Sequence, residues 1–320
     1  MVAGPGGVPR RGAGVPRFLL VVLLLLALVA CLPSGPEREA TVAADPEAVT
    51  VGSFNFSESV VLAELYAQAL ESVGLPVARA LEVGPRELMQ PALEQGLVDV
   101  VPEYLGSALA YFDPGAAVAS LDAFAIHKRL VETLGRSGVE VLAPAPAENQ
   151  NGFAVTAATA ERYGLRTLSD LGPVAGELVF GGPPECRERR LCLAGLESRY
   201  GLQFADFVAL GDAGGRRTRA ALAEGQVDVA LLFTTDGHLA TGEFVLLDDD
   251  RELQPAENVV PVVRRESIER YGDRLVDRLD QVSAALTTDD LSQLNRRVDI
   301  DEEEPAAVAA AWLASEGFVG

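Results

Sequence analysis

Residues 92–100 of this 320-residue chain read ALEQGLVDV, and residues 221–229 read ALAEGQVDV. Six of the nine positions are identical, and an aromatic residue follows both copies at the same offset, Tyr104 in the first and Phe233 in the second. The glycine in each copy predicts the end of a helix, because glycine readily adopts the left-handed C-terminal cap. The apolar residues after it predict a short strand. A chance recurrence of common helix–glycine–strand chemistry is the alternative explanation.

The two aromatic residues indicate where a ligand would lie. Ligands of open α/β sheets bind outside the carboxyl ends of the strands. Two such units about half a chain apart predict two similar lobes, each with one aromatic side chain in a shared cleft. After each aromatic residue we expect a polar segment rich in turns.

The composition limits the classes of function. Hydrophobic residues make up 48% of the chain, which predicts a globular protein of one or two domains. The 26 basic and 47 acidic residues leave a net charge of −21. Binding of nucleic acid needs clustered cations, so this balance argues against a nucleic-acid partner.

The N-terminus predicts export and a lipid anchor. Three arginines and no acidic residue precede an unbroken apolar run of 15 residues, Phe18–Leu32. That run is shorter than the ~20 residues of a spanning helix and fits a signal peptide. Its Leu28–Cys31 stretch resembles a bacterial lipobox, so we expect a lipoprotein signal at 1–30, lipidation of Cys31, and a flexible tether at 31–48. An ordinary secretory signal or anchor with an incidental Cys31 stays open.

The other two cysteines, Cys186 and Cys192, lie close together in a segment rich in glycine and proline. In an oxidising compartment such an even pair predicts a disulfide. A zinc site is disfavoured, because the two histidines of the chain, His127 and His238, lie far from this pair in sequence. We expect neither a metal nor a cofactor.

The order of segments predicts an α/β fold of two lobes. Strand-like and helix-like segments alternate from residue 49 onward as βαβαβ, the start of a doubly wound sheet flanked by helices. The segment 143–150, rich in proline, alanine and asparagine, predicts a domain boundary, and we expect a first crossing between the lobes near 145–150 and a second near 250–260. We therefore expect one lobe at 49–148 with 252–320, the other at 149–251, and closure of the two around a ligand.

Four stretches of the chain resemble a known family. They are VGSFNFSE at 51–58, PEYLG at 102–106, TTDG at 234–237, and the tail LTTDD at 286–290 with Leu294, Asn295, Val298 and Asp299. Together these resemble the solute-binding subunits of ABC importers for quaternary-amine osmoprotectants. The resemblance covers about residues 49–318, and its specificity rests on the order and spacing of the motifs rather than on any one of them.

The resemblance implies a type II periplasmic-binding-protein fold with two crossover strands. It implies a clamp around glycine betaine, choline, carnitine or a relative, on the outer face of a bacterial cell membrane. In the family an aromatic cage holds the trimethylammonium group, whose charge is attracted to ring faces. Uptake would require ABC permease and ATPase subunits as partners.

Carried over to this sequence, the resemblance assigns the walls of the cage to Tyr104 and Phe233, with Phe56 and Phe54 as further candidates. A tyrosine expected near position 151 is an asparagine here, and an aromatic residue expected around 181–184 is absent, so the cage is depleted. A different small polar or aromatic solute is therefore the alternative ligand. The candidate polar contacts are Asn55, Gln150, Asn151, Thr234 and Thr235.

The sequence is compatible with two other classes of function. Glu103 and Asp236 follow corresponding strands and could face each other as an acid–base pair, which would point to an enzyme. The chain has no nucleophile elbow, no zinc-protease motif and no phosphate-binding loop, and we expect no enzymatic activity. A sensory lipoprotein would use the same clamp without transport, and the sequence does not separate the two.

Overall fold

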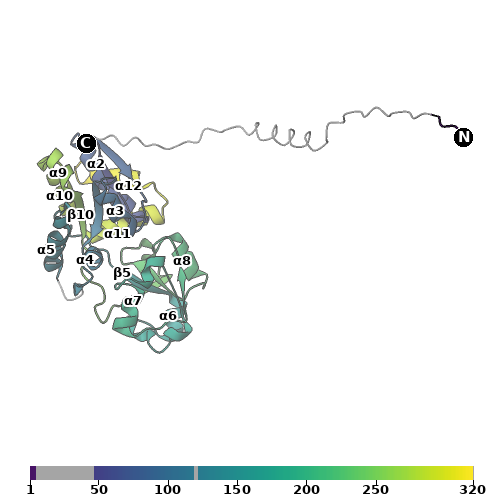
Figure 1. Ribbon diagram of the computed structural model, residues 1–320. Helices are drawn as coiled ribbons and strands as arrows, with labels where there is room; N and C mark the ends of the chain where they lie inside the picture. Colours follow the sequence, from purple (N-terminus) through teal and green to yellow (C-terminus); the bar gives the residue numbers. More distant parts are fainter. Residues whose placement is uncertain (5–46, 119–121, 320) are drawn as a thin grey trace. The chain divides into compact units, whose positions relative to one another are not determined.

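Figure 1 shows a computed structural model of the chain, which describes residues 1–4, 47–118 and 122–319. Contacts group the chain into two units, 1–43 and 44–320, and the fold described below belongs to the second. The predicted lipidation site Cys31 and most of the predicted signal peptide and tether lie outside the described residues.

The first sheet of the described fold has five strands. Its order is β2 (Val77–Ala80), β1 (Val49–Gly52), β3 (Val100–Tyr104), β10 (Val259–Arg264) and β4 (Val139–Val141). Strand β1 is parallel to β2 and β3, whereas β10 runs antiparallel to both of its neighbours. The central strands β1, β3 and β10 are mostly apolar and buried, as expected of a sheet covered on both faces, whereas the edge strand β2 is partly exposed.

The second sheet of the described residues repeats this plan. Its order is β7 (Asp206–Ala209), β6 (Val179–Gly182), β8 (Val229–Phe233), β5 (Asn151–Thr156) and β9 (Phe244–Leu247). Strand β5 is the antiparallel member and takes the place that β10 has in the first sheet. The predicted two-lobed α/β fold is confirmed, and we call the parts built on the two sheets the first and second lobes.

Helices flank both sheets (Figure 1). Those of the first lobe are α2 (Ser57–Ser72), α3 (Arg86–Glu94), α4 (Leu105–Phe112), α5 (Ala123–Leu134), α9 (Arg265–Tyr271), α10 (Asp273–Ala285), α11 (Thr288–Asp299) and α12 (Pro305–Ser315). Those of the second lobe are α6 (Ala157–Tyr163), α7 (Leu193–Gly195) and α8 (Arg216–Ala223), with several short 3₁₀ turns. Helices α10, α11 and α12 pack on α2, so the end of the chain completes the core of the first lobe.

The sequence repeat forms the same unit in both lobes. Gly96 follows the C-cap residue of helix α3 and Gly225 follows that of helix α8, and the two glycines have φ angles of 74° and 70°. These angles lie in the left-handed region that favours glycine. The aspartate of each copy ties its strand to the neighbouring one: Asp99 accepts a hydrogen bond from the backbone of β1 at 2.8 Å, and Asp228 from that of β6 at 2.9 Å. The repeat is therefore structural and not a chance recurrence.

One expectation about the repeat was wrong. The chain after Tyr104 does not enter a polar turn but begins helix α4 at once, with Tyr104 as its N-cap residue. The reason is that Leu105, Ala108 and Leu109 fall on one face and are buried against the first lobe. After Phe233 the expected turn is present, and Asp236 caps the 3₁₀ turn that follows by accepting from the backbone N–H of His238.

The two segments that cross between the sheets lie side by side. Glu148 and Asn258 form an antiparallel bridge, and the backbone N–H of Glu257 donates to the Glu148 carboxylate at 2.9 Å. The crossings therefore support each other directly, next to the carboxyl ends of β3 and β8.

Candidate functional site

A cavity of about 70 Å³ lies where the two lobes meet at the carboxyl ends of β3 and β8. Six of the residues expected at the site line it, from four different parts of the chain: Phe54, Asn55, Phe56, Tyr104, Asn151 and Phe233. The other lining residues are Pro85, Arg86, Ser107, Asn149, Pro183, Glu185, Arg189, Ala213 and Leu231. The location is the one expected for a ligand of an α/β protein.

Phe56 is the centre of the aromatic walls. Its ring centroid lies 6.2 Å from that of Tyr104, 5.3 Å from that of Phe233 and 6.0 Å from that of Phe54. Phe56 is the residue just before helix α2 and is half-buried. Its ring lies between Tyr104 of the first lobe and Phe233 of the second and contacts both. The arrangement offers ring faces from both lobes to one ligand.

Behind these rings the carboxylate of Glu58 gathers hydrogen bonds from both lobes. The hydroxyl of Tyr104 donates to it at 2.6 Å, and the hydroxyl of Thr235, which follows β8, donates at 2.7 Å. The side-chain amides of Asn149 and Asn295 donate at 2.7 and 2.6 Å. Burial, followed by the charge of Glu58, raises the pKa of Tyr104 well above its usual range. Tyr104 is therefore a neutral phenol that donates its proton to this hydrogen bond.

A second buried cluster joins the cavity wall to the second crossing. The guanidinium of Arg86 donates two hydrogen bonds of 2.8 Å to the carboxylate of Glu103. Glu257 accepts from the backbone and the hydroxyl of Ser107 at 2.9 and 2.6 Å. Burial raises the pKa of Glu257 to about 7, with the charge of Glu103 adding to it and that of Arg86 opposing it. Arg86 therefore forms an ion pair with Glu103, and its positive charge also stabilises the ionised form of Glu257.

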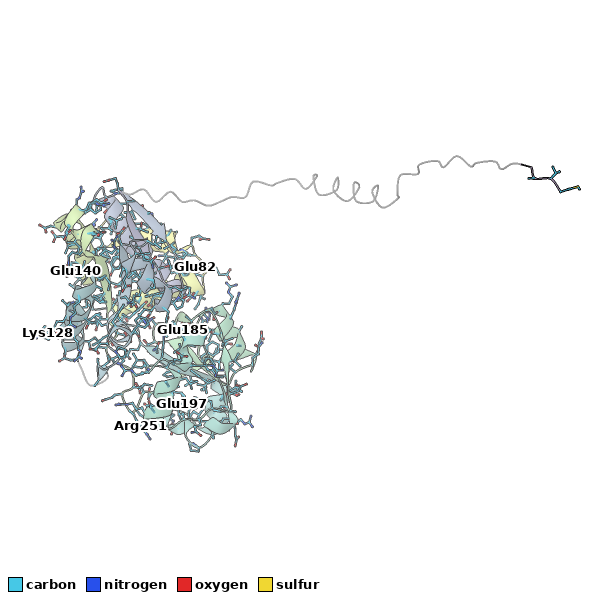
Figure 2. The ribbon with its side chains drawn as sticks, in the orientation of Figure 1. Glu82, Lys128, Glu140, Glu185, Glu197 and Arg251 are labelled. Atoms are coloured by element: carbon cyan, nitrogen blue, oxygen red, sulfur yellow. A yellow bond between two sulfur atoms is a disulfide. The ribbon has the colours of Figure 1, made fainter. Side chains whose placement is uncertain are left out.

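The cysteine loop supplies the cavity wall from the second lobe. Cys186 and Cys192 form the predicted disulfide, with Cα atoms 5.2 Å apart. The loop carries Glu185, which is labelled in Figure 2, and Arg189. The guanidinium of Arg189 lies 3.0 Å from the carboxylate of Glu87 in helix α3, so this loop also contacts the first lobe.

The remaining expected contacts do not line the cavity. The side chain of Gln150 donates to the backbone carbonyl of Pro255 at 2.8 Å. Thr234 is exposed, and its backbone N–H and hydroxyl bond to the first crossing. Thr235 is buried and its hydroxyl is held by Glu58. These three side chains are used within the protein, between the crossings and the lobes.

The proposed acid–base pair does not form. Glu103 is paired with Arg86, whereas Asp236 is paired with Arg219 at 3.0 Å. Each carboxylate is therefore neutralised by an arginine of its own lobe. Within the part of the chain that the structure describes, no group of His, Cys, Asp and Glu side chains could hold a metal ion.

The sequence reading missed several residues of the site. Arg86 and Glu58 begin the helices that follow strands of the first sheet, and Arg189 and Glu185 flank the first cysteine of the disulfide loop. The rule that placed Tyr104 at a strand end applies equally to the first turns of these helices. Applied to charged residues as well as aromatic ones, it would have found Arg86 and Glu58.

Comparison with known families decides the class of protein. Residues 47–315 match the model of the substrate-binding domain of the ABC-type glycine betaine transport system. The chain belongs to this family. A glycine-betaine-binding protein of Pseudomonas aeruginosa is 32% identical over 286 residues, covering 84% of this chain and 88% of that protein. The glycine betaine-binding protein YehZ of Escherichia coli is 30% identical over 278 residues, covering 84% and 91%.

A solved structure shows the same fold. The crystal structure described as a glycine betaine/carnitine/choline ABC transporter superposes with a TM-score of 0.66 at 22% identity, over 84% of this chain and 99% of that one. The chain is thus a substrate-binding component of ABC transport, which acts with a permease, and not an enzyme. Members of this family are extracytoplasmic. Among the described residues no helix is long and apolar enough to cross a membrane.

Proposed function

We propose that this substrate-binding protein captures a small quaternary amine, glycine betaine or a relative such as choline, in the cavity between its lobes. The observation that carries the proposal is the aromatic cluster around Phe56, which combines rings of both lobes in one wall. A quaternary ammonium has no N–H to donate and is held by ring faces. Asn55 and Asn151 are the polar groups that would meet the rest of the solute.

The two arginines that line the cavity are already paired within the protein. Arg86 is held by Glu103 and Arg189 by Glu87, so neither carries the proposal. The competing ligand is a small polar or aromatic solute without a cation. It is favoured by the second-lobe side of the cavity, where Asn151 and Pro183 occupy positions at which the family resemblance predicts aromatic residues.

Thermal unfolding with a panel of solutes tests this proposal. The panel contains glycine betaine, choline, carnitine, amino acids and small aromatic compounds. A ligand at a thousandfold its dissociation constant should stabilise the protein by about 4 kcal/mol and raise the melting temperature by several degrees. A shift with quaternary amines alone supports the proposal. A shift with uncharged solutes alone would leave the fold intact and reject the osmoprotectant.

Closure is part of the same proposal. We take the first lobe to comprise residues 49–148 with 252–320, and the second 149–251, with the crossings at 145–150 and 250–260 as hinges. Small-angle scattering should then show a smaller radius of gyration at saturating ligand. Identical curves with and without a ligand that shifts the melt would contradict closure.

We also propose that Cys31 carries a lipid that anchors the protein to the outer face of the membrane. The motif Leu28–Cys31 and the tether behind it support this. Replacing Cys31 with serine removes the thiol that would carry the lipid. The exported protein should therefore move from the membrane fraction to the soluble fraction. Retention of the Cys31→Ser protein at the membrane would show that another segment holds it there.

A further inference from the structure

Glu58 is a buried carboxylate whose partners are all neutral. Glu58 is only 3% exposed. Its carboxylate accepts four side-chain hydrogen bonds, two from hydroxyls and two from amides. Among the ion pairs of residues 47–118 and 122–319, none includes Glu58. Burying a charged group without a counter-charge costs free energy of folding, so the buried position of the Glu58 carboxylate calls for a functional explanation.

The charge lies directly behind the aromatic walls. Tyr104 lines the cavity with its ring and bonds to Glu58 through its hydroxyl. Phe56 and Phe233 line both that cavity and a smaller one whose wall includes Glu58. A cation held against these rings would therefore be separated from the carboxylate by a single layer of side chains.

The cationic side chains of the cavity do not neutralise Glu58. Arg86 is bound by Glu103 through two hydrogen bonds, and Arg189 is bound by Glu87. The charges of these pairs cancel, whereas that of Glu58 does not. The protein groups around the cavity therefore carry an excess negative charge on the side of the aromatic rings.

We propose that Glu58 makes the site selective for a cation, as the counter-charge that the depleted cage needs. The inference rests on the proposed quaternary-amine function and names the residue that sets its specificity. Two effects combine. Coulomb attraction is screened far less in a buried site than in water. A hydrogen bond from the Tyr104 phenol to a carboxylate also polarises the phenol, which makes its ring face more attractive to a cation.

The test compares two ligands of the same shape that differ in one charge. Glycine betaine is paired with the anion of tert-butylacetic acid, in which carbon replaces the quaternary nitrogen. Both dissociation constants are measured by calorimetry at pH 7 on the full chain purified in detergent. Their ratio is the selectivity for the cation, and a purely structural role of Glu58 would weaken both ligands alike and leave the ratio unchanged.

Glu58→Gln removes the charge and keeps the shape of the side chain. We expect it to lower the selectivity ratio by about tenfold, through loss of affinity for glycine betaine only. Tyr104→Phe disconnects the ring from the carboxylate and should lower the ratio by a smaller factor. The matched control is Glu64→Gln: Glu64 is equally buried on the same helix, with 4% exposure, but is paired with Arg79. It should leave the ratio unchanged.

The outcomes separate the two proposals. If the native chain binds neither ligand, the proposed function fails, and this inference fails with it. If the native chain prefers glycine betaine and Glu58→Gln preserves that ratio, the function stands and the role of Glu58 is rejected. Should Glu58→Gln melt before binding is measured, Tyr104→Phe decides: an unaltered ratio there overturns the proposal.

Discussion

Replacement of Phe56 with alanine should weaken binding of a quaternary amine by at least about a hundredfold. The Phe56 ring packs within 6.2 Å, centroid to centroid, of Tyr104, Phe233 and Phe54. Its removal takes away one ring face, worth roughly 1–2 kcal/mol when desolvated, and the aromatic contacts that hold the neighbouring rings, worth roughly 0.5–1.5 kcal/mol each. A loss of about 3 kcal/mol corresponds to that factor. Calorimetric titration of the variant with glycine betaine and choline measures it.

The matched control is Phe124→Ala. Phe124 is 77% exposed on helix α5, and its replacement should leave the dissociation constant unchanged. A Phe56→Leu variant keeps most of the volume without the ring face, and we expect affinity between those of the native protein and Phe56→Ala. If Phe56→Ala folds and binds within threefold of the native protein, the ligand does not lie against this aromatic cluster.

Replacement of Glu257 with glutamine should stabilise the protein at alkaline pH and not at acidic pH. Burial raises the pKa of Glu257 from 4.5 to about 7 in the folded protein. The folded state therefore binds the proton more tightly than the unfolded state. The stability that this provides is complete below the unfolded pKa and is lost as the pH rises through about 7. At 1.36 kcal/mol for each pKa unit, the loss at pH well above 7 is roughly 3 kcal/mol.

Glutamine does not ionise, so it escapes this loss while its amide still bonds to Ser107. Urea unfolding at several pH values measures the difference in free energy of unfolding between Glu257→Gln and the native protein. We expect that difference to grow in favour of the variant by roughly 3 kcal/mol between acidic and alkaline pH. The exposed Glu132, on helix α5, provides the control, since Glu132→Gln should give a difference that does not change with pH. A flat difference for Glu257→Gln as well would show that its carboxyl group is not perturbed by burial.

The proposed role of Glu58 in selectivity and the expected role of Glu257 in pH-dependent stability both follow from the burial of a carboxyl group. Glu58 and Glu257 both lie beside the cavity and are at least 97% buried, since their exposed fractions are 3% and 1%. Glu58 is held by four donors from both lobes, and Glu257 by two from Ser107. The proposed cationic ligand would supply a positive charge near Glu58, whereas Glu257 already lies close enough to Arg86 for its pKa to be lowered by that charge.

The sequence predicted the elements and part of the site well. Periodicity and the glycines at 96 and 225 placed the helices and strands of both repeat units, because helix hydrogen bonds, helix caps and the period of the apolar residues all depend on residues that are near in sequence. The same pattern placed Tyr104 and Phe233 at equivalent strand ends, and the structure brings both to the cavity. The helix α4 was missed because its N-cap residue, Tyr104, is not one of the usual capping residues and makes no side-chain cap hydrogen bond.

The polar part of the site was decided only by the tertiary structure. Gln150, Thr234 and Thr235 are polar and lie near the cavity, yet the protein itself takes up their hydrogen bonds. Thr235 and Asn295 meet Glu58 across 177 and 237 residues of chain. An apolar face buries itself against whatever apolar surface is nearby, so a local pattern reveals it. A hydrogen bond requires one partner at one distance and angle, and which partner arrives there depends on how both lobes are folded.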